Sequence, residues 1–327
     1  MKYLFIIVTS LMLTMCSGQK SEKEESYEAY LFTYFINNEP EGEQLRYAVS
    51  ADGFNWSPLN NGERVVDLDN VARTKCIRDP HILRTEDGKS FYIVATDMKS
   101  SDGWSSNDGI VMMRSEDLVN WTSRAVDFPT DFPEIYNRDT LTRVWAPQTI
   151  YDAEAGKYMV YYSIENGSYL TIYYSYADDD FTHLTAPEKL ADFGGVVLDA
   201  DIVYNDGQYH MFLSGITKAT STSLHGPWEG YSRTKHYQQT DKAAEGPGVF
   251  KVNNSDEWIL MYDCFRDGYY QFCKSTDLEN FTLVAQTETT GAFTPRHGTV
   301  IGITRTELER LLEAFPSDGL TVESILK

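Results

Sequence analysis

The sequence has few basic residues. It contains 28 Lys and Arg against 49 Asp and Glu, which gives a formal net charge of −21. A chain this acidic repels a phosphate backbone, so we expect no nucleic acid among its partners. Long hydrophobic runs are also rare, and beyond the N-terminus no stretch is long and apolar enough to cross a membrane. Neutral or cationic ligands remain compatible with this composition.

Cysteine is scarce as well, with 4 residues in the chain. There is no CxxC pair and no zinc-type spacing, which argues against a zinc site. Apart from Cys16, three cysteines remain, so at least one is a free thiol or pairs between chains. Cys264 and Cys273 flank a predicted turn at residues 266–268, and a disulfide between them fits this spacing. We favour buried thiols and leave the disulfide open.

The one apolar run lies at the N-terminus. Lys2 precedes YLFIIVTSLMLTM, which ends at Cys16 and is too short to span a bilayer. It reads as a signal peptide, and LTMC resembles a bacterial lipobox, although Met15 is larger than the usual residue before the cysteine. We therefore expect a lipoprotein signal peptide over residues 1–16, with lipidation at Cys16. A flexible tether would span residues 17–27, and one folded domain residues 28–327.

What the chain does contain is aromatic residues, 13% of the total, and a repeated phrase. SADGFNWS at 50–57 returns as SEDLVNWT at 115–122 and STDLENFT at 275–282. YADDDFT and STSLHGPW are looser copies. The phrase recurs at intervals of about 50 to 65 residues, a period typical of repeat architectures. We expect each copy to form an outer turn and strand whose Trp or Phe packs between neighbouring units.

Each phrase ends a unit of four strand-like stretches. The unit reads as a leading strand, a DG-type turn, an apolar strand, a longer loop and then the strands around the phrase. Four-stranded units of this size indicate propeller blades. The first unit lacks its leading strand, and RHGTVIGIT at 296–304 has that pattern without a unit of its own. The prediction is an all-β, five-bladed β-propeller closed by pairing of N- and C-terminal segments, followed by an amphipathic helix over Thr304–Phe315.

Charged residues gather at the starts of the leading strands. These strands line the channel of a propeller, so their first residues meet at one end of its axis. The starts read IRDPHI, VWAPQTI, VLDADIV, AEGPGVF and TPRHGTV. They would bring together Asp79, Asp199 or Asp201, Glu245, Arg296 and His297. We expect three carboxylates at equivalent positions of three blades, and because close like charges are costly, this indicates a functional site.

Two chemistries use such a cluster. Glycoside hydrolysis needs one protonated carboxyl group for the leaving oxygen and one carboxylate that activates water or attacks. A third acid can raise the pKa of the proton donor and orient it. Metal binding by oxygen ligands is the competing chemistry.

The ordered set RDPHI, WAP, DADIVY, EGPGVF and PRHG resembles glycoside hydrolase family 43 over about residues 28–304. The resemblance implies a five-bladed propeller that hydrolyses glycosidic bonds with inversion, mostly exo-acting on arabinose, xylose or sometimes galactose linkages. It implies that Asp79 is the general base, Glu245 the general acid, and Asp199 the residue that orients the acid and raises its pKa. We assign this last role to Asp199 because DPHIL aligns with DADIV. Asp201 then lies one step deeper on the same face of the strand.

Other residues would bind the substrate. Trp145 would stack on a sugar face or belong to the core, and Trp104 would edge the pocket or be an exposed loop residue. The remaining predicted contacts to substrate are Arg78, Asp201, Phe265, Arg296 and His297. The resemblance also implies an ion, often calcium, near His297 on the axis, although no cofactor is expected to be required.

The sequence therefore predicts an inverting exo-glycoside hydrolase that removes terminal pentose, foremost α-L-arabinofuranosyl, from plant polysaccharide. β-Xylosidase and exo-β-galactosidase activity stay open. The alternatives from other classes are a non-catalytic glycan-binding surface lipoprotein and a calcium-dependent structural propeller. We expect a monomer outside the cytoplasm that contacts a membrane only through its lipid anchor. It would sit on an outer membrane, facing the periplasm or the cell surface.

Overall fold

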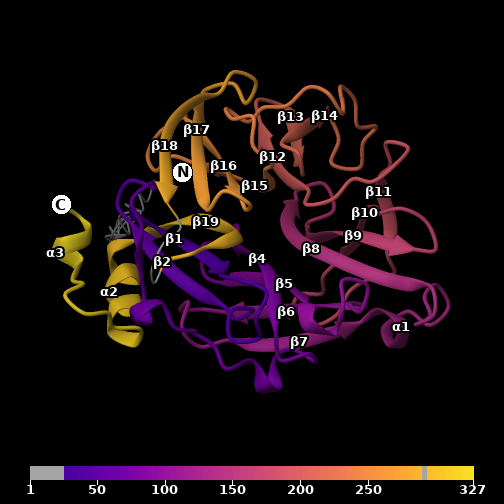
Figure 1. Ribbon diagram of the computed structural model, residues 1–327, viewed down its shortest axis with the longest axis horizontal. Coiled ribbons are helices and arrows are strands. Elements are labelled where there is room, and N and C mark those ends of the chain that lie inside the picture. The colour runs from indigo at the N-terminus through magenta and orange to yellow at the C-terminus, as the bar shows by residue number, and fades with distance from the viewer. Residues whose placement is uncertain (1–25, 289–292) are drawn as a thin grey trace, which may run out of the picture.

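The computed structural model describes residues 26–288 and 293–327, and it shows five antiparallel sheets arranged as the blades of a propeller (Figure 1). The predicted signal peptide, Cys16 and most of the tether lie outside the described residues. Within them, no helix combines the length and the apolar character needed to cross a membrane.

Four of the blades have four strands each. The first contains β19 (Arg296–Thr304), β1 (Tyr27–Phe35), β2 (Arg46–Ser50) and β3 (Ser57–Pro58). The second contains β4 (Ile77–Arg84), β5 (Phe91–Asp97), β6 (Gly109–Ser115) and β7 (Thr122–Asp127). The third contains β8 (Leu141–Asp152), β9 (Lys157–Asn166), β10 (Thr171–Tyr176) and β11 (Glu188–Ala191). The fifth contains β15 (Glu245–Lys251), β16 (Trp258–Cys264), β17 (Tyr269–Ser275) and β18 (Thr282–Glu288).

The fourth blade differs from the predicted pattern. It contains β12 (Asp201–Asn205), β13 (Gln208–Leu213) and β14 (Thr217–Ser221), and its outer strand is reduced to a bridge between Thr220 and Glu229. The phrase in this blade, STSLHGPW, carries Pro227, which has no N–H group to donate to a strand ladder. The expectation of four full strands in every blade is therefore wrong here.

The repeated phrase is a hydrogen-bonded turn. In its third close copy, Asn280 donates from its backbone and side-chain nitrogens to Asp277, at 2.8 and 2.7 Å, and the Ser275 hydroxyl donates to the same carboxylate at 2.9 Å. The same set of bonds recurs in the copies at 50–57 and 115–122. The aromatic residue that follows, Phe281, packs edge-on against Phe212 of the fourth blade, as predicted.

The first blade takes strands from both ends of the described chain. β19 pairs with β1 from Tyr27 opposite Thr304 to Phe35 opposite Arg296. β19 is followed by α2 (Arg305–Ala314), whose capping box joins Thr304 and Glu307, and this confirms the predicted helix. The other helical segments are short: η1 (Asn60–Gly62), η2 (Leu68–Asn70), η3 (Ser100–Asp102), α1 (Phe128–Asp131) and α3 (Val322–Ile325).

The three described cysteines are buried free thiols. The register of β16 and β17 places Cys273 opposite Leu260 and Cys264 opposite Tyr269, so the two side chains lie several rungs apart. The disulfide left open by the sequence therefore does not form, and the interpretation as buried thiols is confirmed. Burial raises the pKa of both thiols to about 11, which makes them unreactive.

Candidate active site

The starts of the inner strands meet around one cavity of about 230 Å³. Of the residues predicted to bind substrate or catalyse, all but Asp201 line it, and so does Trp104. The complete lining is Asn38, Arg78, Asp79, Met98, Trp104, Trp145, Leu198, Asp199, Glu245, Phe265, Arg296 and His297. A small cavity with several convergent polar groups is the form expected of a ligand site.

A bulge at the start of the inner strands aims these side chains. Asp79, Ala146, Asp199 and Gly246 occupy the same position in four blades, and each has a φ between 46° and 56°. The strand register slips at this point in β4, β8 and β15. Such bulges re-aim side chains near functional sites. The prediction of three equivalent acids is wrong in one respect, because Glu245 precedes the bulge position that Gly246 occupies.

Asp79 is held in its ionised form. Its carboxylate accepts a hydrogen bond from Thr96 Oγ1 at 2.9 Å, and its Oδ1 lies 3.4 Å from His297 Nδ1. Burial alone would raise the pKa of Asp79, but the contact with His297, the charge of Arg78 and the Thr96 bond lower it below the ordinary value. A carboxylate of this kind can accept a proton from water.

The pKa of Glu245 is shifted in the opposite direction to that of Asp79. Burial and the neighbouring Asp199 raise the pKa of Glu245, and this outweighs the lowering effect of Arg296 and His297. Its Oε1 accepts a hydrogen bond from Arg296 Nη2 at 2.7 Å, while the side chain remains 31% exposed to the cavity side. A carboxyl group in this setting can hold a proton and donate it.

Asp199 interacts electrostatically with both Asp79 and Glu245. It accepts a hydrogen bond from the Ser214 hydroxyl, and its backbone N–H donates to Ser163 Oγ at 3.3 Å. Burial and the charge of Asp79 raise the pKa of Asp199 above its ordinary value, while His297 opposes the rise. The residue is buried, so its carboxyl group acts mainly on its neighbours.

His297 balances the acids. Burial would lower its pKa, but the bond to Asp79 and the charges of Asp199 and Glu245 raise it to about 9. No group of three or more His, Cys, Asp or Glu side chains suited to a metal ion occurs in residues 26–288 and 293–327. The ion predicted near His297 has no such ligand set in this part of the chain and stays a prediction.

Two tryptophans form one wall of the cavity. The rings of Trp104 and Trp145 lie 6.3 Å apart at 80°, and Trp104 is 49% exposed. Arg143 stacks over Trp145 at 4.8 Å and donates from Nε to the Trp104 carbonyl at 2.9 Å. Arg78 lies 5.2 Å from the Trp104 ring and pairs with Glu43 at 2.9 Å. Trp104 therefore edges the pocket on a loop tied to the next blade.

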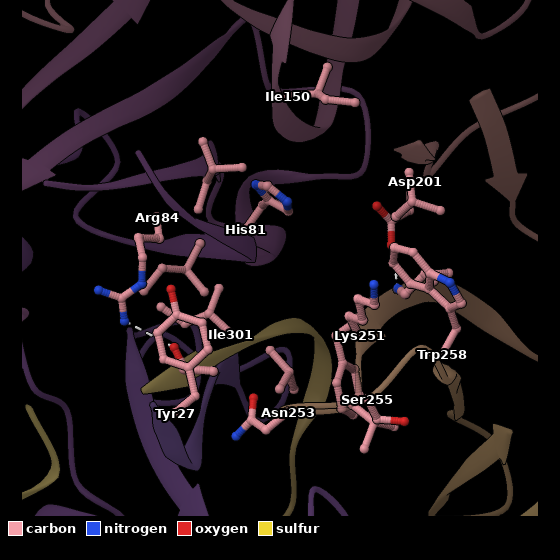
Figure 2. A pocket seen from close by; sticks show the side chains of 18 of the residues that line it. Tyr27, His81, Arg84, Ile150, Asp201, Lys251, Asn253, Ser255, Trp258 and Ile301 are labelled. Carbon is pink, nitrogen blue, oxygen red and sulfur yellow. Dashed lines mark hydrogen bonds between the residues drawn. The ribbon is translucent and has the colours of Figure 1, made fainter. Parts of the chain in front are cut away.

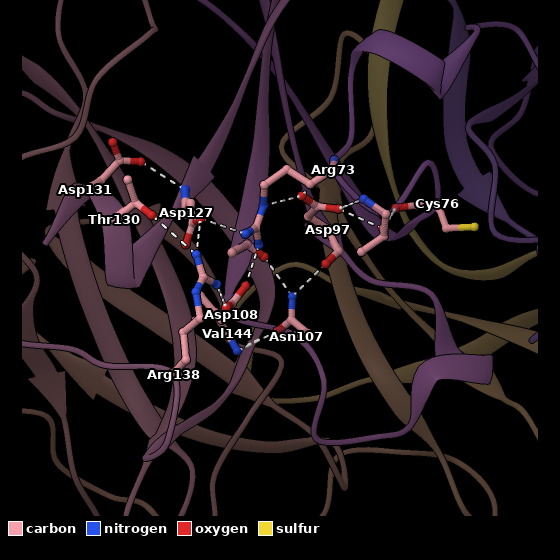
Figure 3. Close-up of polar contacts among 12 residues, drawn as sticks. Arg73, Cys76, Asp97, Asn107, Asp108, Asp127, Thr130, Asp131, Arg138 and Val144 are labelled. Atoms are coloured by element: carbon pink, nitrogen blue, oxygen red, sulfur yellow. Dashed lines mark hydrogen bonds and ion pairs between the residues drawn. The ribbon is translucent and has the colours of Figure 1, made fainter. Parts of the chain in front are cut away.

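The base of that loop is anchored by a polar network (Figure 3). Asn107 donates to the Asp97 carbonyl at 3.0 Å and accepts from the Val144 N–H at 2.6 Å, so it joins the second and third blades. Arg73 contacts Asp97, Asp108 and Asp127 at 3.1, 2.5 and 3.0 Å. These contacts fix the β5–β6 loop, which positions Trp104.

Asp201 lies elsewhere. It lines a separate cavity of about 680 Å³ formed by later residues of the inner strands, together with His81 and Lys251 (Figure 2). Its Oδ2 accepts the Val249 N–H at 2.5 Å, and burial raises its pKa to about 7. The structure therefore does not place Asp201 with the other predicted substrate contacts, because two steps along the strand carry it down the channel.

Several residues of the site were not predicted. Thr96 and Ser214 hold the two aspartates, Asn38 lines the cavity, and Asp263 bonds Arg296. For Asp263 a signal exists, because it is the one charged residue in the apolar stretch WILMYDCF. Thr96 carries no such signal, since threonine is common in strands. Ser214 carries none either, because it lies in the turn that follows β13.

Gly246 is a position where the site requires glycine. Its φ is 56°, and a Cβ atom there would lie 2.5 Å from His297 Cγ. We expect Gly246→Ala to cost about 1–3 kcal/mol of stability and to lower activity, since the His297 ring must shift from the position in which it contacts Asp79. Chemical unfolding and steady-state rates measure the two effects. Gly207→Ala is the control, because its φ is 83° with open space around it, and equal activity losses in both variants would contradict the expectation.

Comparison with known proteins identifies the family of this chain. A family model described as a probable glycosyl hydrolase domain, related to glycoside hydrolase family 43, matches residues 25–309. An α-L-arabinofuranosidase of Bifidobacterium longum is 29% identical over 263 residues, covering 67% of this chain and 24% of that protein. The chain thus spans about a quarter of that relative's length.

Solved structures share the fold at low sequence identity. A family 43 β-1,3-galactosidase has a TM-score of 0.59 at 14% identity, over 80% of this chain and 57% of that one. A family 43 protein from Bacillus licheniformis has a TM-score of 0.53 at 16% identity, over 83% and 54%. The family match covers most of the sequence, so the chain belongs to the glycosyl hydrolases related to glycoside hydrolase family 43.

Proposed function

We propose that the protein is an inverting exo-glycoside hydrolase that removes terminal pentose, foremost α-L-arabinofuranosyl, from plant polysaccharide. One observation carries the proposal. A single cavity holds a carboxylate whose pKa is lowered, Asp79, and a carboxyl group whose pKa is raised, Glu245. Glycoside hydrolysis requires two carboxyl groups whose pKa values are shifted in opposite directions in this way. The arabinofuranosidase among the relatives supports the choice of sugar.

The reaction follows from these two groups. Asp79 accepts a proton from a water molecule, whose oxygen then attacks the anomeric carbon of the terminal sugar. Glu245 donates its proton to the glycosidic oxygen as the bond from that oxygen to the anomeric carbon breaks. The water attacks from the face opposite the leaving group, so the configuration inverts. Afterwards Asp79 carries a proton and Glu245 has lost one, and exchange with solvent restores both.

The surrounding residues serve this step. Burial and Asp199 raise the pKa of Glu245 and so favour its protonated form, while His297 and Thr96 lower the pKa of Asp79 and orient its carboxylate. The Trp104–Trp145 wall offers apolar faces for a sugar ring. No step requires a metal ion.

The proposal extends to the setting of the enzyme. The lipobox-like LTMC and the polar segment after it support a protein tethered through Cys16 to an outer membrane, outside the cytoplasm. We expect this protein to be a monomer. A polymeric glycan would reach the cavity there. Release of the protein from membranes by detergent, and mass spectrometry of a lipidated Cys16, would test this placement.

Release of p-nitrophenol from three aryl glycosides tests the activity: the α-L-arabinofuranoside, the β-D-xyloside and the β-D-galactoside. We expect turnover of the arabinofuranoside, lowered about 10²–10⁴-fold by Asp79→Ala, since the water then lacks its base. Turnover of another glycoside alone would replace the sugar and keep the reaction. Glycan binding without turnover of any glycoside or of a plant-polysaccharide digest would overturn the proposal in favour of a binding protein.

A further inference from the structure

One buried acid next to the site has no part in the reaction described above. Asp263, in β16, is 1% exposed and does not line the cavity. It therefore cannot touch a bound sugar. Burying a carboxylate costs free energy unless the carboxylate is paired. We therefore expect Asp263 to have a partner and an effect on the site.

The strand register shows where Asp263 acts. It lies directly opposite Glu245 on the neighbouring strand. At the same rung of the second and third blades, Arg78 faces Thr96 and Trp145 faces Ser163. The rung therefore carries a hydroxyl residue in those blades and an acid only beside Glu245. Like charges directly opposite one another on paired strands are destabilising, so a fully structural role would favour the hydroxyl here as well.

Arg296 joins the two acids. Its Nε donates to Asp263 Oδ2 at 2.6 Å, and its Nη2 donates to Glu245 Oε1 at 2.7 Å. The guanidinium is a planar fork, so these two bonds fix its orientation. Phe35 and Phe265 lie 5.8 and 5.5 Å from it and complete its surroundings. One cation is thus shared between a buried carboxylate and the proposed general acid.

The sharing of Arg296 between the two acids is important because Glu245, as the proposed general acid, must be protonated before it can donate a proton. An arginine paired with Glu245 alone would favour the ionised form. The titratable groups that face Glu245 are Asp199, Asp263, Arg296, His297 and the buried Tyr270. Of these, Asp263 is the one bonded to Arg296. Burial raises the pKa of Asp263 to about 6, with Arg296 opposing the rise. In its ionised form, bonded to Arg296 Nε, Asp263 offsets the arginine charge.

We infer that Asp263 is a positioning residue for the general acid. It holds Arg296 and takes up part of its charge, so that Arg296 orients the Glu245 carboxyl group without drawing off its proton. The inference rests on the proposed role of Glu245, and it adds a residue that acts only through Arg296.

Carbon-13 NMR of the Glu side-chain carboxyl groups tests this directly, with the Glu245 signal assigned by its loss in Glu245→Gln. We expect Asp263→Asn to lower the titration midpoint of Glu245 by about one pH unit, because Arg296 then pairs with Glu245 alone. Asp263→Ser, which copies the residue of the third blade, should do the same. The alkaline limb of the kcat/KM profile should shift equally, with smaller losses for aryl glycosides whose leaving groups need little protonation.

The outcomes separate the two proposals. An unchanged or raised Glu245 midpoint overturns the role of Asp263, even if activity falls, and so does failure of both variants to fold. A lowered midpoint in a protein that hydrolyses no glycoside supports the positioning and refutes the proposed function. Asp152→Asn is the matched control. Asp152 is equally buried but bonds Tyr176 and His225 away from the cavity, so its loss should leave the Glu245 midpoint unchanged.

Discussion

Glu245→Gln is expected to lower kcat by about 10²–10⁴-fold, the range that general acid catalysis contributes. Gln keeps the shape of the side chain but has no acidic proton for the leaving-group oxygen. Substrates with a poor leaving group, such as a natural glycan, should lose most. Dinitrophenyl glycosides should lose least, because their leaving group departs without a proton. Rates on a series of aryl glycosides, together with glycan affinity by calorimetry, measure both effects.

Substrate affinity and a control variant test the same expectation. The variant should retain substrate affinity, since Glu245 is one of twelve lining residues and the tryptophan wall is untouched. Glu257→Gln is a suitable control, because Glu257 pairs with Lys274 and does not line the cavity. If Glu245→Gln hydrolysed natural glycan at the wild-type rate, Glu245 could not be the proton donor.

Replacing His297 should have the second-largest effect, and it should depend on pH. The pKa of His297 is raised from 6.5 to about 9 in the folded protein, mainly through Asp79, Asp199 and Glu245 acting against burial. A group whose pKa rises on folding stabilises the fold below its unfolded pKa and loses this contribution as pH climbs through the folded value. His297→Gln should therefore cost about 3 kcal/mol below pH 6.5, and the cost should shrink toward pH 9 and vanish above it.

Urea unfolding of both proteins across this pH range measures the difference. The variant should also lose activity, because Asp79 then lacks one of the two cations that lower its pKa. His183→Gln, at a histidine with a 66% exposed side chain, controls for the loss of an imidazole. A cost that stayed constant with pH would show that His297 contributes packing alone.

Much of the architecture was predictable because it repeats. The phrase around Asp52, Asp117 and Asp277 marks the turns of three blades with the same hydrogen bonds, and the spacing of all five copies counts the blades. The fourth blade has three strands where four were predicted, because Pro227 interrupts its copy of the phrase. The site was predictable for the residues that start the inner strands, since the propeller itself brings these positions together.

The remaining parts of the site depend on features that single strands do not reveal. The bulge shifts Glu245 one place from the position of Asp79, and alternation alone does not show this. Asp201 follows Asp199 by two residues, yet Asp199 lies at the bulge before β12 and each of the two lines a different cavity. Asp263 comes into contact with Glu245 and Arg296 only through the pairing of two strands and the neighbouring blade.

The pairing of β19 with β1 also bears on how the enzyme is made. Thr33 and Thr299 share a hydrogen bond across 266 positions of the chain, one of the longest-range contacts in the fold. Contacts of such separation form late, since the intervening loop must first be ordered. β19 carries both Arg296 and His297, so a chain that has folded its middle blades still lacks two of the cations that act on the acids of the site. Catalytic competence should then appear with the slowest folding phase, after most of the β structure has formed.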